Sequence, residues 1–212
     1  MLNRCLLLLF FALVIQVLPA RDMRACFKEA PVDVFPLLTH NNRLDMLDFW
    51  DSKMDAVVRN VYGDSARLSE LRENYMRLES SSVSEMELML LPAMKDTLLC
   101  MVKTYRLLEP ESELSFFHSA TWTPITEKEN LIVLPQWTDF LVLPEKISKE
   151  ELRRVYSKLS YAAMQASLDA DELAIRFTLN VDGGFLDRRE ELAALIKKTV
   201  VMKWNGRKFV LQ

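Results

Sequence analysis

Residues 75–105, "YMRLESSSVSEMELMLLPAMKDTLLCMVKTY", decide the fold class because apolar and polar side chains alternate along them. In "YMRLE" and again in "SEMELML", Met and Leu occupy every second position. A period of two predicts β-strands, and the turn-prone residues at 80–82 and 92–96 separate one strand from the next. We therefore expect an antiparallel meander with one face on a core and the other face in water.

The strand pattern extends outward from this stretch in both directions. It begins near Ser65, and further strand-like segments cover 97–106, 113–118, 161–168 and 173–181. Helical periodicity marks three segments, which start near Asn42, after Ser148 and near Asp187. A hairpin closes the chain around Asn205 and Gly206, a pair that suits a type I′ turn.

This order of elements predicts an α+β fold, with a mainly antiparallel sheet and about three helices packed on it. Residues 21–212 are long enough to form a single domain with its own core. The alternative is two similar halves, at about 27–123 and 145–212, joined by a connection that contains Pro124 and Pro135.

The first predicted helix, "NNRLDMLDFWDSKM" at 41–54, raises the question of an acidic functional site. Arg43, Asp45 and Asp48 are the candidate residues of that acidic helix face. A structural interpretation competes with it, because Asn42 can cap the helix with Asp45 three residues later as the capping-box acid. On a helical projection one arc collects the apolar residues, namely Met46, Leu47, Phe49, Trp50 and Met54.

Residues 1–20 have the composition of a secretory signal peptide. Arg4 precedes an apolar run, and small residues stand before an expected cleavage after Ala20. The run is short for a membrane span, which takes about 20 apolar residues, although an uncleaved anchor is the alternative. Lipidation at Cys26 is unlike the usual pattern because Arg24 stands close before it. We expect a periplasmic or secreted protein that meets the membrane only through its export signal.

Charge and cysteine content limit the partners and the compartment. The formal net charge is −3 with both signs interspersed, which argues against a nucleic-acid surface. Cys26 and Cys100 follow the expected cleavage site, and an exported protein can join two such thiols in a disulfide. Two buried free thiols are the alternative, since Cys100 alternates with Leu98 and Val102 on a predicted strand.

The sequence lacks the signatures of common enzyme and cofactor sites. It contains four glycines, too few and too scattered for a phosphate-binding loop. Its two histidines, His40 and His118, have no neighbouring ligand at zinc spacing. Acid pairs such as Asp169 with Asp171 lack the regular spacing of a calcium loop. We therefore expect no cofactor, no metal and no identifiable catalytic residue.

Two aromatic clusters are the candidate ligand or partner contacts. They consist of Phe117, His118 and Trp122 in "FFHSATW", and of Trp137 and Phe140 in "LPQWTDF". Such rings either anchor a peptide, a glycan or an envelope protein, or fill the core.

Three stretches carry a resemblance to an exported family that is largely restricted to Bacteroidales and is catalogued as a domain of unknown function. They are "FPLLTHNNRLDMLDFWDSKM" (35–54), "LSELRENYMRLESSSVSEMELMLLP" (68–92) and the strand at 99–105. The family pattern has Tyr and Asp where this chain has Phe117 and His118, which weakens a functional interpretation of that strand end. The resemblance implies export and supplies no catalytic residues.

The leading hypothesis is a non-enzymatic binding or interaction module of the cell envelope, with a peptide, a glycan or an envelope protein as its partner. One alternative is an envelope hydrolase that uses two convergent carboxyl groups, which would lie about 5 to 10 Å apart for a glycoside. The other is a structural subunit of an envelope assembly, which would expose a broad apolar patch.

Overall fold

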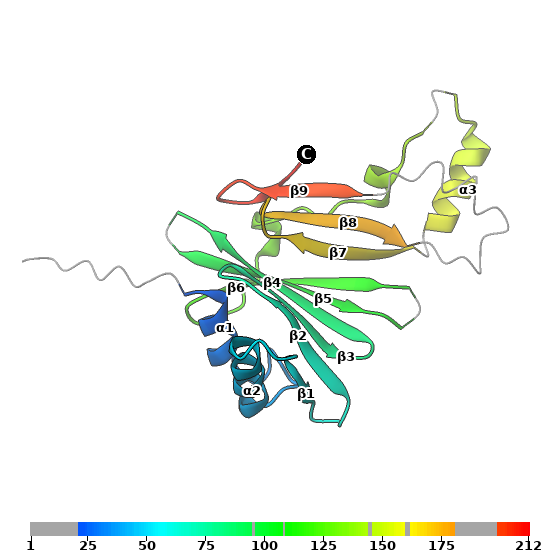
Figure 1. Ribbon diagram of the computed structural model, residues 1–212. Coiled ribbons are helices and arrows are strands. Elements are labelled where there is room, and N and C mark those ends of the chain that lie inside the picture. Colours follow the sequence, from blue (N-terminus) through cyan, green and yellow to red (C-terminus); the bar gives the residue numbers. More distant parts are fainter. Residues whose placement is uncertain (1–20, 95, 108, 144–145, 160–161, 181–198) are drawn as a thin grey trace, which may run out of the picture.

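A computed structural model describes residues 21–94, 96–107, 109–143, 146–159, 162–180 and 199–212 (Figure 1). The fold is α+β, with two antiparallel sheets and helices packed against them. Helices α1 (Met23–Glu29) and α2 (His40–Asp51) lie on one side of the larger sheet, and the smaller sheet lies on its other side. None of the described helices is long and apolar enough to span a membrane.

The larger sheet is the predicted meander, because its six strands neighbour one another in chain order. The strands are β1 (Val57–Arg59), β2 (Ser65–Leu71), β3 (Tyr75–Ser81), β4 (Ser84–Pro92), β5 (Thr97–Tyr105) and β6 (Glu111–His118). Every pair is antiparallel, and β4 aligns with β5 along its whole length, from Ser84 opposite Tyr105 to Pro92 opposite Thr97.

The second half of the chain forms a separate sheet rather than extending the meander. Its four antiparallel strands are β7 (Ala163–Asp169), β8 (Ala174–Asn180), β9 (Val200–Trp204) and β10 (Phe209–Leu211). They also neighbour one another in chain order, so β7 and β10 are the two edge strands.

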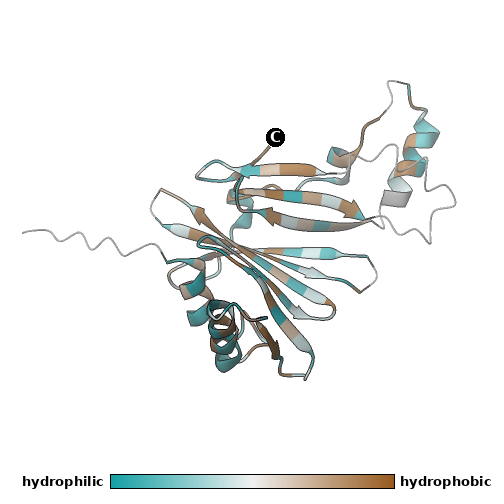
Figure 2. Ribbon diagram, viewed as in Figure 1, coloured by the Kyte–Doolittle hydropathy of each residue, from teal (hydrophilic) through white to brown (hydrophobic). Residues whose placement is uncertain are grey.

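The expectation of one wet face is wrong for the central strands of the larger sheet. Met76 and Leu88 face a core shared with α1 and α2, whereas Met89 and Val102 face a core shared with the smaller sheet. Eight of the nine residues of β4 are buried as a result. Hydrophobic stabilisation grows with the apolar area that is buried, so covering both faces raises the contribution of these strands to stability. Figure 2 shows the alternation of apolar and polar residues along them.

The two cores also separate the two thiols. Cys26 lies in the core under the helices and Cys100 in the core between the sheets, on opposite faces of the larger sheet. Both are free and buried. Burial raises the pKa of Cys26 to about 11 and raises that of Cys100 as well. The structure therefore has two buried free thiols, which was the alternative to a disulfide.

The N-cap of helix α2 stands three residues before the predicted cap, Asn42. Thr39 is the N-cap residue, and its hydroxyl oxygen accepts a hydrogen bond from the Asn42 N–H at 3.1 Å. The Asn42 side chain completes the box by accepting from the Thr39 N–H at 3.0 Å. Asp45 is therefore a mid-helix surface residue, and Met54, predicted on the apolar arc, lies beyond the helix and is exposed.

Helix α3 (Lys149–Leu159) agrees closely with its prediction. The Ser148 hydroxyl accepts from the Glu151 N–H at 3.1 Å, and the Glu151 carboxylate accepts from the Ser148 N–H at 3.0 Å, which is a capping box. Val155 of this helix packs in the core between the sheets. Helix α1 was not anticipated, and the helix predicted from Asp187 lies outside the described residues.

The closing hairpin forms, with a turn shifted by one residue from the prediction. Asn205 and Lys208 pair, with the Asn205 N–H donating to the Lys208 carbonyl at 3.1 Å, so Gly206 and Arg207 are the central residues. Gly206 has a φ of 90° and is the only one of the two with a positive φ. A type I′ turn needs a positive φ at both central residues, so the turn is not the predicted type I′.

Candidate functional site

The predicted aromatic strand end lies mostly in the core beneath the helices. Trp122 is 5% exposed, and its ring centroid lies 5.5 Å from that of Phe117 and 6.1 Å from that of Phe35. Trp122 adopts a φ of 59°, a left-handed conformation that is strained for a bulky residue. The ring N–H of Trp122 is buried without an acceptor. Phe117 is half-buried against the same core.

His118 lies at the surface and does not join these rings in a pocket. Its Nδ1 atom lies 3.0 Å from the Asp96 carboxylate, and both side chains are more than 40% exposed. Water screens such a pair, so the geometry is that of a surface contact.

The proposed acidic helix face is divided between two sides of α2. Asp45 and Asp48 are exposed, whereas Arg43 is 2% exposed and its guanidinium carbon stands 5.7 Å from the centre of the Phe35 ring. Burial lowers the pKa of Arg43, and its Nε and Nη1 atoms have no acceptor. The three residues therefore do not form one acidic surface.

Trp137 and Phe140 belong to the connection between the sheets, in the short helix η2 (Trp137–Phe140). Phe140 is fully buried in the core between the sheets, and Trp137 is 42% exposed. Together with the short helix η1 (Lys128–Asn130), η2 brackets an extended segment, residues 131–136, that passes over the smaller sheet. Trp137 thus directly follows a segment that lines two hollows of the described surface.

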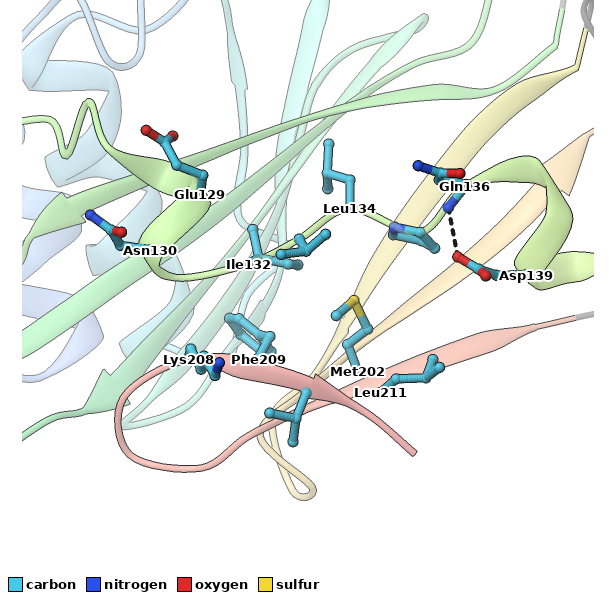
Figure 3. Close-up of a pocket in the computed structure, with 13 residues that line it drawn as sticks. Glu129, Asn130, Ile132, Leu134, Gln136, Asp139, Met202, Lys208, Phe209 and Leu211 are labelled. Carbon is cyan, nitrogen blue, oxygen red and sulfur yellow. Dashed lines mark hydrogen bonds between the residues drawn. The ribbon is translucent and has the colours of Figure 1, made fainter.

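Two hollows lie on either side of this segment. The first has a volume of about 570 Å³ and lies between the segment and β10, where Ile132 faces Phe209 and Met202 (Figure 3). The second has a volume of about 580 Å³ and lies against β6, β7 and β8, where Leu114, Met164 and Phe177 line it. Both volumes are in the range of small-ligand sites. The residues that line both hollows are Glu129, Ile132, Val133 and Leu134.

Backbone and side-chain hydrogen bonds anchor the start of residues 129–134, which form the wall shared by the two hollows. The Lys128 ammonium donates to the Leu114 carbonyl at 3.3 Å, and the Phe209 N–H donates to the Leu131 carbonyl at 2.7 Å. Beyond Leu131 the wall diverges from β10, and Val133 and Leu134 are 76% and 52% exposed. Adjacent exposed apolar residues beside a hollow are typical of a contact surface.

The two edges of the smaller sheet differ in how their backbone groups are satisfied. At β7, the Ala166 N–H donates to the Ser112 hydroxyl at 2.9 Å and the Leu168 N–H donates to the Glu87 carboxylate at 2.5 Å. Side chains of the larger sheet therefore cover that edge. At β10, the bond from Phe209 to Leu131 is the corresponding contact, and the remainder of the edge faces the first hollow.

Acidic residues reach the hollows without forming a secluded pair. Glu113, Glu129 and Asp139 line them and are exposed, and the Asp139 carboxylate already accepts the Gln136 N–H at 2.7 Å. A general acid at neutral pH needs a carboxyl group withdrawn from water. Within the described ranges, no three His, Cys, Asp or Glu side chains gather as a metal site requires.

Sequence reasoning missed the hollows because their walls come from segments far apart in the chain. A signal was nonetheless present in "LIVLP" at 131–135, four apolar residues directly before a proline that no strand or helix pattern absorbs.

Comparison with known proteins gives a family for this chain. A family model described as "Protein of unknown function (DUF3256)" matches residues 15–209. The chain belongs to this family. No curated protein matches it. Among solved structures, a domain of an uncharacterized protein from Porphyromonas gingivalis W83 is similar, with 23% sequence identity and a TM-score of 0.75. The similarity covers 91% of this chain and 98% of that one, and it supports the fold alone.

Proposed function

We propose that this protein is an exported, non-enzymatic binding module of the cell envelope. Its binding site is the pair of hollows on either side of residues 129–134. The single observation that carries the proposal is that exposed apolar side chains, Val133 and Leu134, line two hollows of about 570 and 580 Å³.

The chemistry of the hollows favours capture over catalysis. Their walls are mainly aliphatic, with polar groups such as Asn130, Gln136 and Lys208 at the ends of the first one (Figure 3). Sites of this composition hold a ligand by apolar contact and orient it with a few polar groups. The described acids that line the hollows, Glu113, Glu129 and Asp139, are exposed, so they do not supply the withdrawn carboxyl group that a general acid needs there.

The proposed location rests on the leader-like residues 1–20, with cleavage after Ala20 and delivery to the periplasm or the exterior. The similar protein of Porphyromonas gingivalis, a member of the Bacteroidales, makes the envelope of that group of bacteria the place to look for the partner. Peptides, glycans and envelope proteins are the partner classes that fit such a place.

Affinity capture from an envelope extract of the source bacterium tests the proposal. The protein is compared with a double variant, Val133→Asp with Leu134→Asp, and with Val32→Asp, which places one such charge at an exposed apolar position away from the hollows. We expect the double variant alone to lose its captured partner, because a buried carboxylate must be desolvated. Equal capture by all three proteins would contradict the proposed site.

A further inference from the structure

The first hollow contains unpaired backbone groups that point to its occupant. In the antiparallel pair of β9 and β10, Lys208 bonds to Asn205 and the Gln212 N–H donates to the Val201 carbonyl at 3.0 Å. Hydrogen-bonded and non-bonded positions alternate along such a pair. Phe209 and Leu211 therefore direct their N–H and C=O groups away from β9, toward the open edge.

Three of these four outward groups have no hydrogen bond to a described residue. The Phe209 N–H bonds to Leu131, whereas the Phe209 carbonyl and the N–H and carbonyl of Leu211 remain open. Residues 132–136 pass nearby without pairing with β10, which leaves the space of the first hollow between them. Natural proteins usually cover an edge of this kind, as this protein does at β7.

We propose that an extended segment of another polypeptide adds to β10 as a fifth strand of the smaller sheet. This inference rests on the proposed function and names the chemical class of its ligand. A peptide backbone supplies the alternating acceptor and donor that the Leu211 N–H and the two carbonyls need. An acyl chain offers neither group and would leave these backbone groups without partners.

The lining of the hollow defines the side chains of such a segment. Successive residues of a strand point to opposite faces, so every second one would pack on Ile132 and Met202 and the others would face water. Glu129 and Lys208 lie at one end of the hollow and form no ion pair with a described residue. The partner is therefore a segment with apolar residues at alternate positions and polar residues at the Lys208 end.

Selection of a random decapeptide library displayed on phage against the purified protein provides the probe. Selected peptides are resynthesised with single backbone N-methyl groups, and binding is measured by fluorescence anisotropy. We expect methylation to weaken binding about tenfold at alternate positions and to have little effect between them, because only every second N–H pairs with β10. This series uses the unaltered protein, so it does not depend on how any variant folds.

Two substitutions of one residue test the same point from the protein side. Leu211→Pro removes the outward N–H, and proline is tolerated at a sheet edge where that group makes no ladder bond. Leu211→Ala removes the side chain and keeps the N–H. We expect Leu211→Pro to bind the selected peptides about tenfold more weakly than Leu211→Ala, with similar thermal midpoints for the two variants.

Three results would overturn the inference. The first is a library that yields no binder. The second is a series of N-methylated peptides in which the loss of binding does not alternate along the peptide. The third is equal binding by the two Leu211 variants when both are folded. If peptide binding is lost in the Val133→Asp, Leu134→Asp double variant but shows no such alternation, the hollow binds peptides without strand addition, and the proposed function survives alone. A dimer that pairs through its own β10 edges and excludes the peptides would also contradict a separate partner.

Discussion

The Asp169 carboxylate holds the turn between β7 and β8. It accepts the N–H groups of Asp171 and Glu172 at 3.2 and 3.0 Å, and the Nη2 of Arg176 at 2.5 Å. The hydrogen bond from Arg176 is the main cause that holds the pKa of Asp169 below its ordinary 3.8. The stability that it contributes is therefore present above pH 3.8 and is lost as the pH falls through the lower folded-state pKa.

From this we predict the pH dependence of Asp169→Asn. The variant is expected to lose about 1 kcal/mol of unfolding free energy at pH 7, because it keeps the backbone contacts but lacks the charge that faces Arg176. The difference from the parent protein narrows below about pH 4, where the unfolded parent also loses this charge. Urea unfolding at pH 7, 5 and 3.5 measures the difference in unfolding free energy between the two proteins. A difference that increased toward acidic pH would be incompatible with a lowered pKa of Asp169.

The thiols give a second prediction at the residue scale. Because Cys26 and Cys100 occupy different cores and burial raises both pKa values, neither reacts with N-ethylmaleimide in the folded protein at pH 8. Both react in urea without any reductant, as peptide mass mapping would show. A requirement for reductant would mean that the two are joined after all.

At the scale of the elements, two different N-cap residues have been assigned to α2, one from the sequence and one from the structure. Sequence reasoning placed Asn42 at the cap with Asp45 in the box, whereas the structure uses Thr39 and Asn42. We expect Thr39→Ala to cost about 1 kcal/mol and Asp45→Ala less than about 0.5 kcal/mol. Chemical denaturation of both variants decides the matter, since the reverse order of costs would restore the predicted cap.

Elements with a strong local period were predictable and those set by tertiary contacts were not. The capping box before α3 and the alternation of β3, β4 and β5 depend only on residues that are close in the sequence. The structure confirms both the helix and the strands that they predicted. Helix α1 has only seven residues, too few for a period to show, and its burial depends on the larger sheet. The turn of the last hairpin moved because Asn205 pairs with Lys208, which sequence alone leaves open.

At the scale of the whole molecule, Glu87 connects the two sheets. Its carboxylate accepts the Arg77 Nη2 at 2.6 Å and the Leu168 N–H of β7 at 2.5 Å. Alternation alone assigned Glu87 to a wet face, because nothing local reveals that a second sheet covers it. Burial raises the pKa of Glu87, which these two donors only partly offset.

Removing this contact tests how the sheets are held together. Glu87→Ala leaves the Leu168 N–H without its acceptor in a buried position, and we expect it to cost about 2 kcal/mol in urea unfolding. Asp55→Ala is the matched control, because its exposed pair with Arg67 is worth less than about 1 kcal/mol. Equal costs would show that the contact between the sheets does not depend on Glu87.

The candidate site belongs to the same scale, since its walls come from the connection, β6 and the smaller sheet. The aromatic residues were chosen as candidate contacts because they cluster in the sequence. Whether each of them is buried depends on tertiary contacts, which the sequence does not show. Trp122 and Phe140 lie in different cores, and only the neighbourhood of Trp137 overlaps the hollows. An open strand edge leaves no local signature at all.

Amide hydrogen exchange at Leu211 is the most direct measurement of the central claim, that β10 presents an open edge to a peptide. The exchange rate is followed by NMR in the free protein and with a selected peptide, and the Val210 amide, which faces β9, serves as the internal reference. We predict rapid exchange of the Leu211 amide in the free protein and strong protection on binding, with little change at Val210. A Leu211 amide that is already protected in the free protein, or that stays unprotected in the complex, would contradict it.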